Sequence, residues 1–542
     1  MLRESYIFML LYNPLTFVAV DIMGMASERG NGQDGGRGVM SVCTARSLTL
    51  LGIDALPVEV EVDVSAGLPG FSIVGLPDAA VQEARERVKV AISNSGFKFP
   101  TKKVIVNLAP AHLRKEGPAF DLPIALAVLA VSGVVPAQRL DGAGVVGELS
   151  LDGGLRGVRG ALCMAEGARR EGLRSLVLPE SNAAEAASIG GVKVFGMSSL
   201  REAVDFFSGV REVEPAVAEE DGRPEEVRSG DDFADVAGQR FAKRALEVAA
   251  SGGHNVLMSG PPGSGKTMLA RRLPGILPPL TLEESIEVTK VHSAAGQGSG
   301  ALMRARPFRS PHHTISTSGL AGGGSNPRPG EVSLAHHGVL FLDEFPEFSR
   351  ATLEVLRQPL EDGHVTISRV AATLSYPARV TLVCSMNPCP CGYSGDKRRT
   401  CRCSAGQIER YQGRISGPLL DRIDLFVDVP RLSREELRGG EAAEPSKDIR
   451  ARVAKARDAQ HRRQRVSNSA LAGRRLREVC TLRGDSEALF GTAIDRMGLS
   501  GRAHDRVLRV ARTVADLAGE TGISVEHLAE ALNYRRSSFF GR

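Results

Sequence analysis

Residues 255–267 have the sequence NVLMSGPPGSGKT, and this stretch decides the fold of the chain around it. Its apolar start predicts a buried strand, and its end matches G-x-x-x-x-G-K-[ST] just before a helical stretch. Backbone N–H groups in such a glycine loop, together with the helix N-terminus, favour a polyphosphate. We therefore predict that Lys266 neutralises the β- and γ-phosphates of ATP and that the Thr267 hydroxyl binds Mg²⁺. The predicted ATP-binding residues of the loop are Gly260, Pro261, Pro262, Gly263, Ser264, Gly265, Lys266 and Thr267.

An acidic pair completes this site. Gly338–Glu344 (GVLFLDE) predicts a central strand with two carboxylates at its C-terminal end, where ligands bind in an open parallel sheet. Asp343 is expected to hold Mg²⁺ through water, and Glu344 to polarise the attacking water.

Two further buried strands are predicted downstream. Arg379–Met386 ends at Asn387, whose amide is suited to position the lytic water. Ile423–Val429 follows Arg422, which is suited to reach the γ-phosphate of a neighbouring subunit.

The length of the chain predicts about two to four domains. Residues 40–207 alternate strand and helix patterns, as in an α+β domain; Val58–Val64 (VEVEVDV) predicts a strand and Ala79–Asn94 a helix. Acidic and polar stretches separate the later parts. The predicted organisation is an extension (1–39), an α+β domain (40–207), an acidic linker (208–232), a nucleotide core (233–430), a linker (431–447) and a helical domain (448–542).

Residues 1–39 are predicted to be a non-native or disordered extension, with translation starting at Met40. Their apolar pieces are interrupted by polar residues, and residues 30–38 resemble a glycine-rich linker. The sequence contains no apolar stretch long enough to cross a bilayer. Without a secretion signal, the eight cysteines predict a reducing, cytoplasmic location with free or metal-bound thiols.

Together these elements resemble the AAA+ superfamily in its magnesium-chelatase-like branch, and within it the YifB/ComM family. The blocks that carry the resemblance are Gly67–Asp78 (GLPGFSIVGLPD), Asn107–Pro110 with Lys115–Pro118, Phe233–Gln239 (FADVAGQ), Arg306–Thr314 (RPFRSPHHT), Ser385–Gly392 (SMNPCPCG) and Arg414–Leu425 (RISGPLLDRIDL). The resemblance implies a multidomain α/β chain: an S5-like α+β domain, a central AAA+ P-loop core and a C-terminal helical lid. It also implies a hexameric ring that hydrolyses ATP while moving branched DNA, as in natural transformation.

Three site residues follow from the motifs of this family. Asn387 matches sensor 1, Arg422 matches the arginine finger, and Arg502 in Gly498–Arg502 (GLSGR) matches sensor 2.

The first domain also resembles the proteolytic domain of Lon-type proteases, which use a Ser–Lys dyad. The matching positions here are Ala119 and the neighbourhood of Leu162, without a lysine close by. A dyad works by removing the proton of the hydroxyl, so we predict that this domain is not proteolytic.

Four clustered cysteines form the pattern C-x-C-x9-C-x-C. Four thiols within this span suit a tetrahedral Zn²⁺, although four free thiols in a loop remain the alternative. The residues are Cys389, Cys391, Cys401 and Cys403.

The charge distribution suggests a polyanionic partner. Residues 448–542 hold 19 Lys and Arg against 11 Asp and Glu, a net charge of +8 in a chain of +5. Arg306, Arg309 and Arg369 are the predicted DNA contacts in the core, with a solvated loop as the alternative. A DNA-translocating ATPase and a chelatase-type chaperone that remodels a protein both remain open; stimulation of ATP hydrolysis by DNA separates them.

Overall fold

The computed structural model describes residues 42–218, 231–298, 300–324, 327–368, 373–396, 398–433, 436 and 443–535. The predicted extension, most of the acidic linker and Arg369 lie outside these residues. Among the described helices, none combines the length and apolar character that crossing a bilayer requires.

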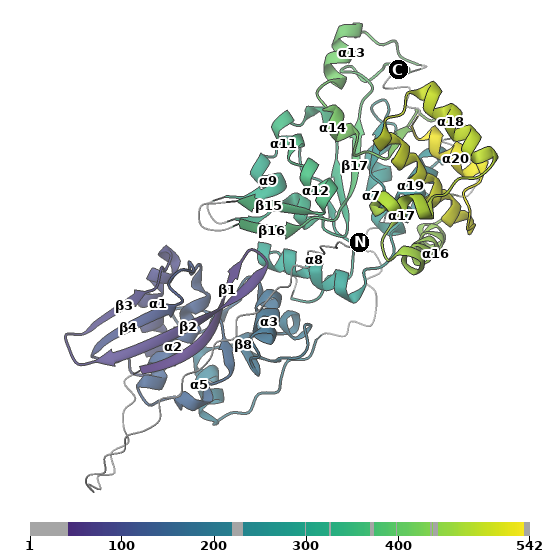
Figure 1. The fold of residues 1–542 in the computed structure, drawn as a ribbon. Helices are drawn as coiled ribbons and strands as arrows, with labels where there is room; N and C mark the ends of the chain where they lie inside the picture. The colour runs from purple at the N-terminus through teal and green to yellow at the C-terminus, as the bar shows by residue number, and fades with distance from the viewer. Residues whose placement is uncertain are drawn as a thin grey trace, which may run out of the picture. The chain divides into compact units, whose positions relative to one another are not determined.

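The first part of the chain is built on a seven-stranded sheet of order β3-β4-β2-β1-β5-β8-β9 (Figure 1). β1 pairs antiparallel with β2, and β2 with β4, whereas β5, β8 and β9 continue the sheet in parallel. The predicted strand Val58–Val64 lies within β2, where the buried Val58, Val60 and Val62 alternate with more exposed acidic residues. The strands are β1 (Val42–Leu51), β2 (Asp54–Ser65), β3 (Gly70–Val74), β4 (Lys103–Ala109), β5 (Ala143–Val145), β8 (Ser175–Pro179) and β9 (Lys193–Met197), with a small β6–β7 pair (Glu148–Leu149, Leu155–Arg156).

Helices cover this sheet on both faces. One core cluster joins the sheet to α1, α2 and α5, and a second joins its other face to α3 and α4. The prediction of a helix over Ala79–Asn94 is confirmed, with Asp78 accepting a hydrogen bond from Val81 N at its start. The helices are α1 (Ala79–Asn94), α2 (Asp121–Val131), α3 (Ala161–Arg170), α4 (Ala183–Ala187) and α5 (Leu200–Ser208).

The second part contains a five-stranded parallel sheet of order β11-β14-β17-β10-β18. Successive residues of β10 point to opposite faces, so Val256 and Met258 join one core cluster and Leu257 another. Apolar runs without alternation are typical of strands buried on both faces, which explains why the sequence revealed them. The strands are β10 (Val256–Ser259), β11 (Phe308–Arg309), β14 (Val339–Leu342), β17 (Thr381–Met386) and β18 (Leu425–Asp428).

Two helical layers enclose this sheet. On one side α6 and α7 share a core with the C-terminal helices; on the other lie α9, α10, α11 and α14. The core helices are α6 (Arg240–Gly252), α7 (Lys266–Ile276), α8 (Leu282–Ala295), α9 (Thr317–Ala321), α10 (Glu331–Leu334), α11 (Arg350–Glu354), α12 (Arg357–Asp362), α13 (Ala405–Gln412) and α14 (Gly417–Leu420). Two hairpins accompany them, β12–β13 (Gly322–Gly323, Arg328–Pro329) and β15–β16 (His364–Ser368, Thr373–Pro377).

The C-terminal part is helical, as its pattern predicts. Its helices are α16 (Ser446–Gln464), α17 (Gly473–Val479), α18 (Asp485–Met497), α19 (Gly501–Ala518) and α20 (Val525–Asn533). Val453 of α16 and Val510 of α19 belong to one buried cluster with residues of α6 and α7. Because α16 contacts α7, this part packs directly on the helix that follows the glycine loop.

Candidate nucleotide-binding site

The glycine loop connects β10 to α7, as its sequence predicts. Gly263 and Gly265 have φ angles of +76° and +93°, a region that side chains disfavour. A Cβ atom on Gly260 would lie 2.1 Å from the carbonyl oxygen of Val429, so only glycine fits there. The loop therefore delivers its backbone to the N-terminus of α7, where free N–H groups favour an anion.

The Lys266 ammonium group is folded against this loop. Its Nζ donates to Gly260 O at 2.7 Å and to Pro261 O at 3.1 Å. Burial lowers the pKa of Lys266 to about 8, while the nearby carboxylates of Asp343 and Glu344 act in the opposite direction. A polyphosphate at this position would restore the charge that burial disfavours.

Asp343 lies at the end of β14 between two hydroxyl groups. Thr267 Oγ1 donates to Asp343 Oδ2 at 2.8 Å, and Ser385 Oγ donates to Asp343 Oδ1. The Thr267 hydroxyl and the Asp343 carboxylate are hard oxygen ligands, which suit Mg²⁺. The sequence predicted Thr267 and Asp343 but missed Ser385; its only signal was its position at the end of a buried strand next to β14.

Glu344 and Asn387 follow the carboxyl ends of β14 and β17. Glu344 has a left-handed φ of +52°, which turns its half-exposed carboxylate away from the strand. Its Oε2 lies 3.4 Å from His313 Nδ1, a contact that the sequence did not predict. Asn387 Oδ1 lies 3.4 Å from Lys266 Nζ, so the amide predicted to position water is next to the ammonium predicted to bind phosphate.

Arg422 and Arg502 pair with residues outside the glycine loop. The Arg422 guanidinium donates to Pro418 O at 2.7 Å and to Arg357 O at 3.1 Å, and pairs with Glu361. Arg502, on α19, lies 3.7 Å from Asp421, the residue before Arg422. The structure therefore groups these two arginines on one edge of the core.

The predicted DNA contacts in the core have partners inside the fold. Arg306 donates to Pro278 O at 2.6 Å, His337 O at 2.7 Å and Glu284 at 2.9 Å. Arg309 forms a two-pronged pair with Glu331 at 2.6 and 2.8 Å. A phosphate contact by either arginine would have to compete with these bonds.

In the first domain, neither dyad position carries a reactive group. Ala119 is in a short 3₁₀ turn (Pro118–Phe120), and Leu162 is fully buried in α3.

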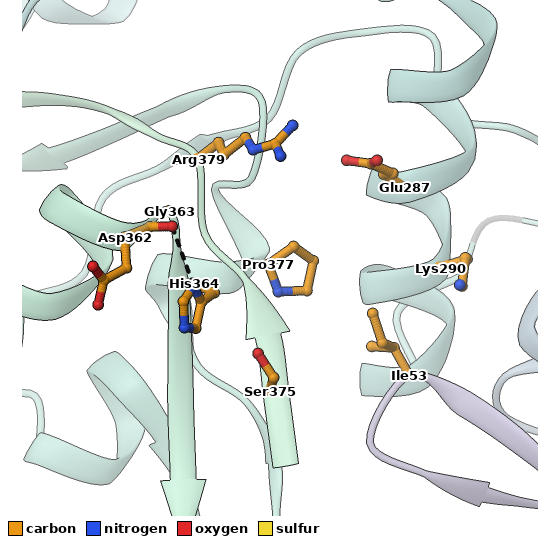
Figure 2. A pocket seen from close by; sticks show the side chains of 9 residues that line it. All are labelled: Ile53, Glu287, Lys290, Asp362, Gly363, His364, Ser375, Pro377 and Arg379. Carbon is orange, nitrogen blue, oxygen red and sulfur yellow. Dashed lines mark hydrogen bonds between the residues drawn. The ribbon is translucent and has the colours of Figure 1, made fainter. Parts of the chain in front are cut away.

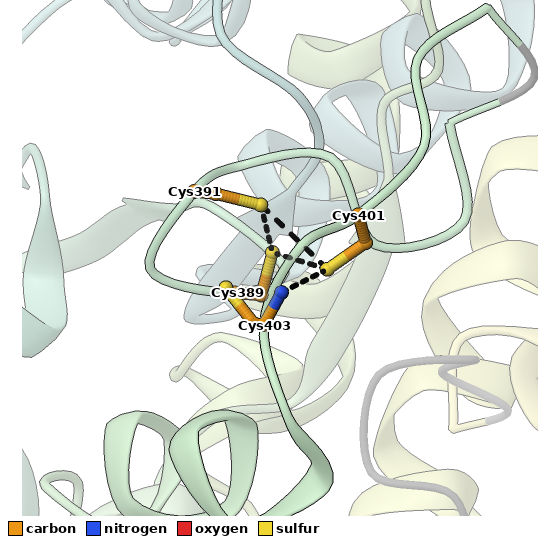
Figure 3. Close-up of side chains that lie close together, drawn as sticks. All are labelled: Cys389, Cys391, Cys401 and Cys403. Carbon is orange, nitrogen blue, oxygen red and sulfur yellow. Dashed lines mark hydrogen bonds between the residues drawn. The ribbon is translucent and has the colours of Figure 1, made fainter.

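The four clustered cysteines converge after β17, as Figure 3 shows. The Sγ atoms of Cys389, Cys391 and Cys401 lie 3.4 to 3.6 Å apart, and all four sulfur atoms lie within 4.8 Å of one another. The cluster could hold one metal ion.

A cavity of about 410 Å³ lies apart from the nucleotide loop (Figure 2). No residue of the glycine loop or the acidic pair lines it, so it is not the nucleotide site. Its lining residues are Ile53, Glu287, Lys290, Asp362, Gly363, His364, Ser375, Pro377 and Arg379.

Beside this cavity, Glu287 accepts hydrogen bonds from Nε2 of both His336 and His337 at 2.9 Å. Arg379 N donates to His336 Nδ1 at 3.0 Å, so His336 is neutral with its proton on Nε2. Glu287, His336 and His337 lie close enough together to hold a metal ion, but these hydrogen bonds explain their proximity without one.

Comparisons with known proteins cover most of the chain. Residues 232–437 match the family described as magnesium chelatase, subunit ChlI; residues 60–182 match subunit ChlI of Mg-chelatase; and residues 443–535 match the ChlI C-terminal family. A Salmonella typhimurium protein named YifB is 45% identical over 92% of this chain and 97% of its own length. The competence protein ComM of Haemophilus influenzae is 45% identical over 92% of this chain and 98% of its own. The magnesium-chelatase 38 kDa subunit of Cereibacter sphaeroides is 26% identical over 55% of this chain and 88% of its own.

Proposed function

This chain belongs to the YifB/ComM family of magnesium-chelatase-like proteins, and from that premise we propose that it is an ATP-hydrolysing motor that acts on DNA. The observation that carries the ATPase part is the position of Asp343 between the Thr267 and Ser385 hydroxyls, beside Lys266. ATP would bind with its phosphates on the glycine loop and Mg²⁺ on Thr267 and Asp343. Glu344 would then take the proton of the attacking water.

The ATPase proposal is tested with two variants and a matched control. Lys266→Ala is expected to lose nucleotide binding, whereas Glu344→Gln should keep binding and lose hydrolysis by about 100-fold or more. Glu347→Gln is the control, because Glu347 pairs with Arg414 at 2.7 Å on the surface and should turn over normally. Turnover by Lys266→Ala at the wild-type rate would refute the proposal.

DNA is the proposed substrate because of the basic helical domain and because one relative is named a competence protein. Exposed arginines gather at the end of α16 and along α17; they are Arg462, Arg465, Arg475 and Arg477. When exposed arginines bind phosphates, the DNA releases the counterions held there. The affinity of the protein for DNA should therefore fall steeply as the salt concentration rises.

The DNA proposal is tested by ATPase stimulation and by salt dependence of binding to branched and single-stranded DNA. The double variant Arg475→Ala/Arg477→Ala should lower the log–log salt slope by about 2. Arg85→Ala/Lys89→Ala, which removes two exposed cations from α1, should leave the slope unchanged. Robust ATP hydrolysis that no DNA stimulates would favour the other candidate, a magnesium-chelatase-like chaperone that remodels a protein partner.

We also propose that the protein works as a ring, most simply a hexamer. Arg502 lies 3.7 Å from Asp421, the residue before Arg422, and both arginines pair with residues outside the glycine loop. In a ring they would contribute to the nucleotide site of the neighbouring subunit.

A further inference from the structure

The segment from Cys389 to Cys403, called here the cysteine loop, lacks a hydrophobic core of its own. Its described residues form no helix or strand, and among its cysteines only Cys389 is fully buried. Such a loop needs crosslinks to hold one shape, because each ordered residue costs about 1–2 kcal/mol of backbone entropy.

The sulfur geometry suits one tetrahedral ion. With Zn–S bonds of about 2.3 Å, the sulfurs of a tetrahedral site lie about 3.8 Å apart, close to the 3.4 to 3.6 Å between Cys389, Cys391 and Cys401. A [4Fe–4S] cluster places each cysteine on a separate iron and a [2Fe–2S] cluster divides the four over two irons, so both spread the sulfurs further. Two backbone N–H groups point at sulfur, Ser394 N to Cys389 at 3.3 Å and Cys403 N to Cys401 at 3.4 Å, which stabilises thiolate ligands.

The cysteine loop contacts the glycine loop through Gly392. Gly392 has a φ of +84°, and a Cβ atom there would lie 2.6 Å from Cδ of Pro262. Backbone of the cysteine loop therefore touches the phosphate-binding loop directly. Asn387 precedes Cys389 by two residues in the sequence, and its Oδ1 lies 3.4 Å from Lys266 Nζ.

A second connection runs through Arg431. Its guanidinium pairs with the buried Asp396 at 3.0 Å and donates to Pro262 O at 3.4 Å. Asp396 itself accepts from two backbone N–H groups of the cysteine loop. The guanidinium groups of Arg399 and Arg431 both lie over the Tyr393 ring, 5.1 and 5.6 Å from its centroid.

We propose that Cys389, Cys391, Cys401 and Cys403 bind one Zn²⁺, and that the metal tightens ATP binding by holding the cysteine loop against Pro262 and Asn387. Four thiols release their protons as the ion binds. With the metal in place, the cysteine loop holds the glycine loop in its binding conformation. ATP binding then costs less conformational entropy, because fewer residues of the glycine loop become ordered on binding. This inference rests on the proposed ATPase function.

The metal itself is tested without reference to activity. Metal analysis of the purified full chain should show one zinc per chain, and Cys401→Ser/Cys403→Ser should lose it. Cys480→Ala, which removes a buried thiol from the helical domain, should retain it. Less than half an equivalent of zinc, or iron in its place, overturns the site.

The coupling is tested by the affinity for a fluorescent ATP analogue. Chelation of zinc from the wild-type chain should weaken binding about tenfold, and added zinc should restore it. Arg431→Ala should keep the zinc and weaken nucleotide binding, because it removes the connection between the cysteine loop and Pro262 but none of the four thiols. This variant also covers the case in which the double cysteine variant fails to fold.

The two proposals fail in different ways. A wild-type chain that holds zinc but binds no nucleotide refutes the ATPase function. A wild-type chain that binds nucleotide equally well with and without zinc refutes the coupling alone.

Discussion

Thr267 Oγ1 donates a hydrogen bond of 2.8 Å to Asp343 Oδ2, although 76 residues separate the two in the chain. The contact exists because β14 and β10 lie on either side of β17 in the parallel sheet, so that their carboxyl ends meet at one edge. Ser385, at the end of β17, holds the other oxygen of the same carboxylate. The two hydroxyls orient Asp343 before any ligand arrives.

Ser385→Ala should weaken the response to Mg²⁺ more than it slows catalysis. Without the hydroxyl, one oxygen of Asp343 loses its partner and the carboxylate can rotate away from the metal position. We expect the Mg²⁺ concentration for half-maximal ATPase to rise about fivefold or more, with a smaller change at saturating Mg²⁺. Ser333→Ala, at a buried serine of α10 whose hydroxyl has no partner among the described residues, is the control. An unchanged Mg²⁺ titration for Ser385→Ala would show that this serine does not position Asp343.

Arg422→Ala should bind ATP and fail to hydrolyse it in the assembled protein. Its guanidinium is held by Pro418 O, Arg357 O and Glu361, and would leave these partners to reach a neighbouring subunit. Arginine fingers contribute a factor of about 1000 or more to turnover.

Mixing subunits tests whether Arg422 acts on its neighbour. Arg422→Ala and Glu344→Gln chains, each inactive alone, should recover activity when mixed, because each supplies the group that the other lacks. Mixing Arg422→Ala with the Arg422→Ala/Glu344→Gln double variant should recover none. If the first mixture stays inactive while it still assembles, Arg422 acts within its own subunit or not at all.

Arg512→Ala should destabilise the helical domain by about 3 kcal/mol. Arg512 is 1% exposed; it donates to Thr521 O at 2.7 Å and to Asp516 at 3.2 Å. Its loss would leave the Thr521 carbonyl without this donor and the buried Asp516 with one cation fewer. The control is Arg474→Ala, since the Arg474 side chain is 89% exposed and its pair with Glu478 is worth at most about 0.5 kcal/mol. Equal denaturation midpoints for the two variants would contradict this difference.

His336 should make the fold sensitive to mild acid. Burial lowers the pKa of His336 from 6.5 to about 4, and its Nδ1 accepts from Arg379 N, so a proton there would break a hydrogen bond. Between pH 6.5 and 4 the unfolded chain binds this proton and the folded chain does not, so stability falls as pH falls. The loss amounts to about 3 kcal/mol and levels off below the folded pKa.

The pH effect is measured from denaturation midpoints at pH 6.5 and 4.5. Glu287, the carboxylate that accepts from His336, has its pKa lowered to about 2 by hydrogen bonds from His336 and His337, so it stays ionised across this window. His336→Gln keeps a donor and an acceptor but does not titrate. Its stability should therefore fall less than that of the wild type between pH 6.5 and 4.5. His461→Gln, at an exposed histidine of α16, should follow the wild type. Parallel pH curves for the wild type and His336→Gln would rule out this role.

The sequence by itself determined the glycine loop, the acidic pair and the strands that carry them. These features are local: a contiguous run of apolar residues, glycines and one lysine forms strand, loop and helix whatever the rest of the chain does. The helices described between residues 448 and 535 and the helix over Ala79–Asn94 followed from periodicity in the same way.

Only the tertiary structure decided which side chains meet across the sheet. Ser385 beside Asp343, His313 beside Glu344 and Gly392 against Pro262 join residues that are distant in sequence. The same is true of Arg306, whose guanidinium is bonded within the fold, and of Arg502, which lies beside Asp421. Such contacts depend on strand order and loop path, which arise from the packing of the whole core and leave no periodic or local pattern in the sequence.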